Sequence, residues 1–138
     1  MYSTTILFVQ PPAESGVRLR GRLEDRGYKV VEAPDTATAM DVVNRSAIAL
    51  VVTELYLSVG TSRCLARVIR RSPALRRTKV LAYTTHGKRR DRAWARNAGA
   101  HGYVITRSGE ERFLQVVDNL MHPPKSKRSA AASPLGTS

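Results

Sequence analysis

Short apolar runs and amphipathic stretches alternate along the chain from residue 5 to about residue 121. The apolar runs are rich in β-branched residues, as buried strands are. They lie at residues 5–9, 28–33, 79–83 and 103–105, with one more centred on residues 50–52. The stretches between and after them repeat apolar residues at helical spacing. They predict helices at about residues 12–26, after Asp35, and at residues 63–71, 89–98 and 108–121.

Residues that commonly begin or end helices support these boundaries. Asp35 is placed to cap the amino end of the second helix, and Gly27 and Gly99 follow the first and fourth helices. Ser108 with Glu111 three residues later has the spacing of a capping box. Five strands alternating with five helices predict an α/β fold, a parallel sheet covered on both faces.

Polar residues follow several of the predicted strands. In open parallel sheets, functional residues gather beyond the carboxyl ends of the strands. This places residues 10–11, 54–56, 84–85 and 106 around one crevice.

The length and composition indicate a single small domain. Of the 138 residues, 42% are apolar, and no apolar run approaches the roughly 20 residues needed to cross a bilayer. We expect a domain at residues 1–121 and a disordered, basic, Pro/Ser/Ala-rich tail at residues 122–138. The start lacks a signal-peptide pattern, and Cys64 is the only cysteine, which suits the cytoplasm.

Positive charge is concentrated in one stretch of the chain. The net charge is +12, and residues 61–96 hold twelve Lys/Arg but only one acid, Asp91. Two successive helices carry most of this charge and are expected to be neighbours on one face of the sheet. The predicted basic patch is Arg63, Arg67, Arg70, Arg71, Lys88, Arg89, Arg90, Arg92 and Arg96.

Two interpretations of this patch remain open. It provides the phosphate-neutralising residues that non-specific nucleic-acid binding requires. However, no helix-turn-helix, zinc-finger or RNA-binding-sheet signature accompanies it. In the other interpretation, the arginines simply solvate exposed helix faces.

Four segments, in order and spacing, resemble the response-regulator receiver domain. They are ILFVQPP (residues 6–12), ALVVTELYL (49–57), VLAYTTHG (80–87) and AGAHGYVIT (98–106). The resemblance covers about residues 5–121. It implies a three-layer, flavodoxin-like, doubly wound sheet of five parallel strands in the order 2-1-3-4-5.

The resemblance also implies a phosphoacceptor pocket, and several of its positions are changed here. Glu54 stands where the family has its acceptor aspartate. Gln10 and Pro11 stand where the family has a Mg²⁺-binding acid pair. Thr106 replaces the lysine that contacts the phosphoryl group, and Arg107 replaces the proline after it. The switch residues, a hydroxyl and an aromatic, are retained as Thr84 and Tyr103.

These replacements predict a degenerate receiver. Mg²⁺ prefers carboxylate oxygens and water in octahedral geometry, and here only Glu54 offers a carboxylate. We therefore expect no metal, no cofactor, no ordinary phosphorylation and no enzymatic activity. Glu54 either mimics a phosphorylated aspartate or is a solvated acid in an inactive site.

The expected function is signal transduction by contact with a signalling protein, as a single-domain pseudo-receiver. The face formed by the fourth helix, fifth strand and fifth helix is the expected contact surface, and a homodimer through it is an open alternative. A nucleic-acid-associated module using the basic 61–96 region is the alternative function. A membrane partner is not expected.

Overall fold

The structure is a computed structural model that describes residues 4–9, 13–53, 69–84 and 89–123. Strands and helices alternate along these residues, as the sequence pattern predicted. The strands are β1 (Thr5–Val9), β2 (Lys29–Ala33), β3 (Leu50–Thr53), β4 (Lys79–Thr84) and β5 (Gly102–Ile105). The α-helices that lie wholly within the described residues are α1 (Ala13–Asp25), α2 (Thr36–Arg45), α4 (Arg89–Ala98) and α5 (Glu110–Met121). Two short 3-10 helices, η1 (Pro73–Leu75) and η2 (Thr106–Ser108), precede β4 and α5.

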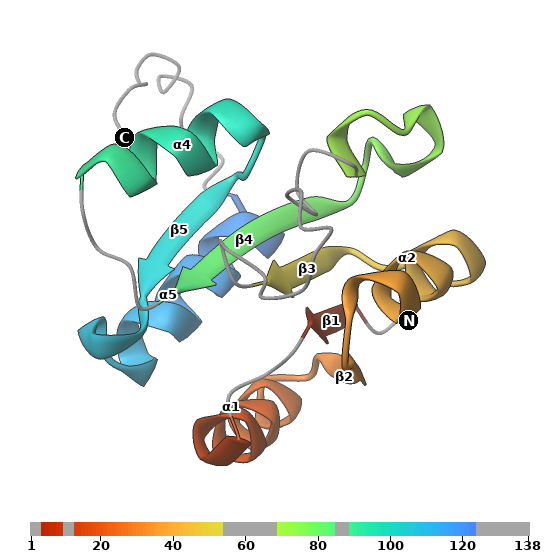
Figure 1. Cartoon of the computed structure of the whole chain (residues 1–138). Helices are drawn as coiled ribbons and strands as arrows, with labels where there is room; N and C mark the ends of the chain where they lie inside the picture. Colours follow the sequence, from red (N-terminus) through yellow and green to blue (C-terminus); the bar gives the residue numbers. More distant parts are fainter. Residues whose placement is uncertain (1–3, 10–12, 54–68, 85–88, 124–138) are drawn as a thin grey trace.

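The five strands form one parallel sheet in the order β2-β1-β3-β4-β5 (Figure 1). This confirms the predicted flavodoxin-like order. The crossing point lies at β1, which pairs with β2 on one side and with β3 on the other. Because every strand runs in the same direction, all five carboxyl ends lie at one edge of the sheet.

Alternate residues of each strand pack into separate cores on the two faces of the sheet. Ile6 and Phe8 of β1 join the core beneath α1 and α5, whereas Leu7 and Val9 join the core beneath α2. Period-two alternation in strands produces this division. Ala82 of β4 continues the α2 face and contacts Ala95 of α4. The sheet is thus covered on both faces, which explains why its strands read as nearly continuous apolar runs.

An aromatic cluster attaches α5 to the centre of the sheet. Phe113 is fully buried, and its ring centroid lies 5.9 Å from that of Phe8 and 4.6 Å from that of Tyr83. Burial raises the pKa of Tyr83, and the negative charge of Glu110 adds to this effect. The amino end of α5 is therefore placed close to the carboxyl ends of β1 and β4.

The predicted helix boundaries are confirmed at some positions and wrong at another. Asp35 caps α2, because its side chain accepts a hydrogen bond of 2.8 Å from the backbone N–H of Thr38. This bond lowers the pKa of the Asp35 carboxyl. The capping box of Ser108 and Glu111 does not form. Gly109 occupies the N-cap of α5 without a side-chain bond, and Ser108 belongs to η2.

Candidate functional site

The carboxyl ends of β3, β4 and β5 form the predicted crevice edge. Thr53 is paired in register with Ala82, and Thr84 is paired with Ile105. Thr84, the last residue of β4, is fully buried, and Thr106 follows β5 directly at the same edge. The structure therefore brings Thr84 and Thr106 to neighbouring strand ends, as the sequence predicted.

Thr84 and the aromatic residue Tyr103 lie on the same face of the sheet. Tyr103 is paired in register with Ala82, two residues before Thr84 on β4. Residues two apart on a strand share a face, so the hydroxyl and the ring occupy diagonal positions on the side covered by α4. Tyr103 is half-buried and packs against the small core of Ala82 and Ala95.

A cation covers the ring of Tyr103. The guanidinium carbon of Arg92, on α4, lies 5.2 Å from the ring centroid, within the range of a cation–π interaction. The sequence placed Arg92 in the basic patch but did not predict this pairing. The sequence alone does not show which arginine of this stretch contacts the Tyr103 ring, because that depends on how α4 packs on β5.

Thr106 and Arg107 belong to η2 and not to β5. Thr106 is half-buried, and its carbonyl accepts a hydrogen bond of 3.2 Å from the N–H of Gly109. Arg107 is exposed. The predicted strand end at residue 105 is confirmed, and Thr106 lies just beyond it in η2.

The remaining predicted pocket residues, Gln10, Pro11 and Glu54, lie outside the described residues. Their chemistry can still be compared with the ion that the pocket of an active receiver holds. Gln10 provides a neutral amide and Pro11 has no side-chain ligand, so Glu54 is the only carboxylate of the three. Among the described side chains, no group of three metal-ligating residues could hold an ion. This donor set does not fit a Mg²⁺ site, which needs several hard oxygen ligands.

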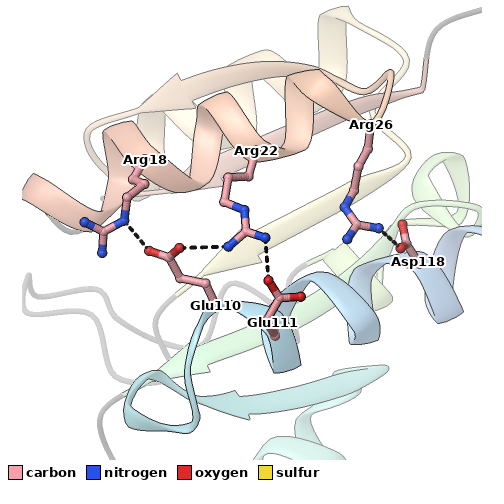
Figure 2. Close-up of polar contacts among 6 residues, drawn as sticks. All are labelled: Arg18, Arg22, Arg26, Glu110, Glu111 and Asp118. Atoms are coloured by element: carbon pink, nitrogen blue, oxygen red, sulfur yellow. Dashed lines mark hydrogen bonds and ion pairs between the residues drawn. The ribbon is translucent and has the colours of Figure 1, made fainter.

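The acids at the amino end of α5 face α1 (Figure 2). The carboxylate of Glu110 contacts Nε of Arg18 at 2.6 Å and Nη1 of Arg22 at 3.1 Å, and Glu111 contacts Arg22 at 2.5 Å. The hydrogen bond from Arg18 is the main cause of the lowered pKa of Glu110. Conversely, the hydrogen bonds to Glu111 and Glu110 raise the pKa of Arg22.

Farther along α5, Asp118 is the third acid that pairs with an arginine in or just after α1. These acids and arginines together form the α1–α5 ion-pair row. Asp118 pairs with Arg26 and also accepts a hydrogen bond of 2.8 Å from the hydroxyl of Tyr28. Sequence reasoning missed the row. The spacing of Arg18, Arg22 and Arg26, one helical turn apart, is a signal of a common helix face, but it does not identify acids about ninety residues away.

The predicted basic patch is described only in part. Arg70, Arg71, Arg92 and Arg96 are exposed. Arg89 and Arg90 belong to α4, but their side chains lie outside the described part of the chain, as do residues 63, 67 and 88 altogether. The helix before β4 ends at Arg70, and Arg71 lies in a turn instead of the predicted helix.

The carboxyl end of this helix adjoins α4, as predicted. A Cβ built on Gly99, just after α4, would lie 2.4 Å from Cγ of Arg70, so the stem of Arg70 crosses this glycine. Gly99 has a φ of 102°, a conformation that other residues rarely adopt.

None of the helices in the described ranges combines the length and apolar character required to cross a bilayer. The comparisons with known proteins agree with the geometry. No curated protein sequence matches the chain. The model of the family "Response regulator receiver domain" matches residues 13–118.

Solved structures of receivers share the fold. The non-phosphorylated HemR receiver domain from Leptospira biflexa is 23% identical with a TM-score of 0.76, and the match covers 91% of this chain and 99% of that one. A response regulator from Thermotoga maritima is 22% identical with a TM-score of 0.76, covering 87% and 98%. The chemotaxis protein CheY4 from Vibrio cholerae is 18% identical with a TM-score of 0.76, covering 86% and 99%. Since the family model matches more than half of the residues, the chain belongs to the response regulator receiver domain family.

Proposed function

We propose that this protein is a pseudo-receiver that transmits a signal by binding another protein, without Mg²⁺-dependent phosphorylation and without a catalytic step of its own. The observation that carries the proposal is the chemistry of the pocket positions. Phosphoryl transfer requires a positioned acceptor and neutralisation of the phosphoryl charge. Gln10, Pro11 and Thr106 replace the acids and the lysine that would supply both.

The geometry at the end of β5 supports this proposal. Thr106 follows the strand directly, beside the end of β4, so a neutral hydroxyl stands where a phosphoryl group would need a cation. Arg18 and Arg22 do not provide a substitute, because both are engaged by Glu110.

The proposed partner surface is the α4–β5–α5 face. Here β5 is the edge strand of the sheet, and Tyr103 lies half-buried beside Arg92. From α5, the half-buried apolar residues Val116 and Leu120 pack near Gly102 at the start of β5. Half-buried aromatic and apolar residues combined with arginine are typical of protein interfaces.

Charge favours an acidic partner over a second copy of this chain. On this face, α4 presents Arg92 and Arg96. A second copy would have to offer the acids of α5, but Glu110, Glu111 and Asp118 are directed toward the arginines of α1. A homodimer through this face would bring two α4 helices together, each with four arginines and one acid, Asp91, which is unfavourable.

Intact-mass measurement with a small acyl-phosphate donor and Mg²⁺ tests the proposal. We expect no phosphoryl adduct on the wild-type protein. The matched control is a variant with the family pocket restored, Gln10→Asp, Pro11→Asp, Glu54→Asp and Thr106→Lys, which should acquire one acid-labile phosphoryl group. An adduct on the wild type, at Glu54 or elsewhere, would refute the absence of phosphorylation. The control verifies that the donor is active and that the fold can accept the group.

A further inference from the structure

Ion pairing divides the described arginines into two groups. Arg18, Arg20, Arg22, Arg26 and Arg45, all in or just after α1 and α2, contact carboxylates. Eight others are exposed and form no ion pair in the described part of the chain: Arg70, Arg71, Arg76, Arg77, Arg92, Arg96, Arg107 and Arg112. We define the arginine surface as the five of these that lie between the third helix and β4 or in the last turn of α4: Arg70, Arg71, Arg76, Arg77 and Arg96.

The turn that carries four of these arginines is firmly attached to the domain. It runs from the end of the third helix through η1 to β4, and Ile69 and Leu75 are buried beneath it. The buried hydroxyl of Thr78 donates a hydrogen bond of 2.9 Å to the carbonyl of Ile48. Backbone bonds from Ser72 to Ile69 and from Leu75 to Ser72 close the turn. The four guanidinium groups therefore project from a defined backbone.

The turn and the carboxyl end of α4 form one continuous surface. The stem of Arg70 lies across Gly99, and the N–H of Gly99 bonds to the carbonyl of Arg96 at 3.0 Å. Figure 1 shows both segments at the end of the sheet where β4 and β5 begin. This is the end opposite the candidate crevice, and the arginine surface shares only Arg96 with the α4–β5–α5 face.

The local field at this end is positive. His101, just before β5, has a lowered pKa because of burial and then because of the charges of Arg70 and Lys79. Its Nδ1 accepts a hydrogen bond of 3.1 Å from the N–H of Val80, which the neutral ring can do. Between residues 69 and 109 the sequence has one acid, Asp91 of α4, whose side chain lies outside the described part of the chain.

The helix dipoles reduce this field but do not cancel it. A helix carboxyl end carries about half a negative charge. The third helix ends at Arg70 and α4 ends at Ala98, so the two together offset about one of five positive charges.

We propose that the arginine surface binds the phosphate backbone of a nucleic-acid duplex. Guanidinium groups present planar, forked donors that match phosphate oxygens. The turn itself exposes only Pro73 and Ala74 as apolar residues, so it lacks the aromatic or large aliphatic anchors on which protein interfaces depend. The α4–β5–α5 face has such residues, and this contrast assigns a polyanion to one surface and a protein to the other.

Fluorescence anisotropy with a short, labelled, mixed-sequence DNA duplex tests the proposal. The full chain is titrated at several salt concentrations. Five phosphate contacts predict a slope of about −4 to −5 in a plot of log K against log salt. A rise from about 50 to about 200 mM salt should then weaken binding by several hundred-fold.

Two charge-matched variants distinguish this surface from net charge. In a triple variant, the substitutions Arg71→Gln, Arg76→Gln and Arg77→Gln remove three exposed arginines that form no ion pair within the described ranges, and they leave the Arg70–Gly99 contact intact. They should reduce the slope to about −2. The control variant, Arg20→Gln, Arg45→Gln and Arg112→Gln, removes the same charge elsewhere and should retain the wild-type slope. Far-UV circular dichroism of each variant confirms that it is folded.

Additional ligands test whether the arginine surface recognises the backbone of a duplex. An RNA duplex that binds with the same dependence on the three arginines supports recognition of the backbone. Preference for a single strand, or binding only to anionic lipid vesicles, would overturn the assignment to a duplex. So would equal losses in the two variants, or the absence of wild-type binding at low salt. A failure here leaves the phosphodonor experiment unaffected, since the crevice lies at the opposite end of the sheet.

Discussion

The hydroxyl of Tyr28 offers a specific test of how α5 is attached to the remainder of the domain. Tyr28 is 6% exposed and lies between α1 and β2. Its hydroxyl donates a hydrogen bond of 2.8 Å to Oδ1 of Asp118, whose other oxygen contacts Arg26. Tyr28→Phe removes this single bond and retains the buried ring, so the apolar contribution to stability is nearly unchanged.

The expected cost is about 1–1.5 kcal/mol at pH 8. Hydrogen bonds to charged groups contribute about 1.5–3 kcal/mol. The cost lies at or just below the lower end of this range, because the Asp118 side chain is 35% exposed and retains Arg26 and access to water after the substitution. For a domain of this size, such a loss lowers Tm by roughly 4–6 °C.

The stability difference between the wild type and Tyr28→Phe should shrink as the pH rises. Burial raises the pKa of Tyr28, and its hydrogen bond to Asp118 adds to this effect. Above about pH 10 the unfolded chain loses the phenolic proton while the folded protein retains it. The wild type then loses about 1.4 kcal/mol of stability per pH unit that Tyr28→Phe does not lose. The stability difference between the two proteins should therefore close near pH 11.

Urea unfolding of both proteins, followed by far-UV circular dichroism at constant ionic strength from pH 8 to pH 11, measures this difference. Other titrating groups are common to the two proteins and cancel. An Asp118→Asn variant and the double variant complete a cycle that isolates the pair. A difference that stays constant over this pH range would refute the proposed bond, as would equal stability at pH 8.

Two further predictions concern the basic half of the molecule. Gly99→Ala and Gly27→Ala introduce similar backbone strain, because the two glycines have φ values of 102° and 97°. Only the Cβ added at residue 99 would contact a neighbouring side chain, that of Arg70. Gly99→Ala should therefore be about 1–2 kcal/mol more destabilising than Gly27→Ala in urea unfolding. Adding Arg70→Ala should abolish this extra destabilisation. An equal cost at the two glycines would show that the Arg70 contact carries no strain. Arg92→Glu should release a protein partner recovered from source-cell extract, while Arg76→Glu, on the arginine surface, should not. Retention by both variants, or a stable homodimer of the wild type in light scattering, would contradict an acidic partner on the α4–β5–α5 face.

Local signals in the sequence predicted the elements because their causes are local. The β-branched runs form the strands, Asp35 caps α2, and Gly99 ends α4 with positive φ. The receiver fold followed from the order of these elements. The arrangement of Thr84 and Thr106 at one edge followed from parallel strands, whose carboxyl ends coincide.

Predictions failed where a distant partner competed with a local one. Ser108 and Glu111 have the spacing of a capping box, yet Glu111 contacts Arg22 of α1, 89 residues away in sequence. This competing interaction is not visible in the local pattern.

By itself, the sequence determined the fold family and the chemistry of the pocket positions, since a side chain's functional groups do not depend on where it lies. Only the tertiary structure decided which charges meet. It directs the acids of α5 toward the arginines of α1, and among the described residues it gives Arg70, Arg71, Arg76, Arg77 and Arg96 no carboxylate partner. Charge pairing acts over a few ångströms in space, and the packing of helices on a sheet sets those distances independently of separation along the chain.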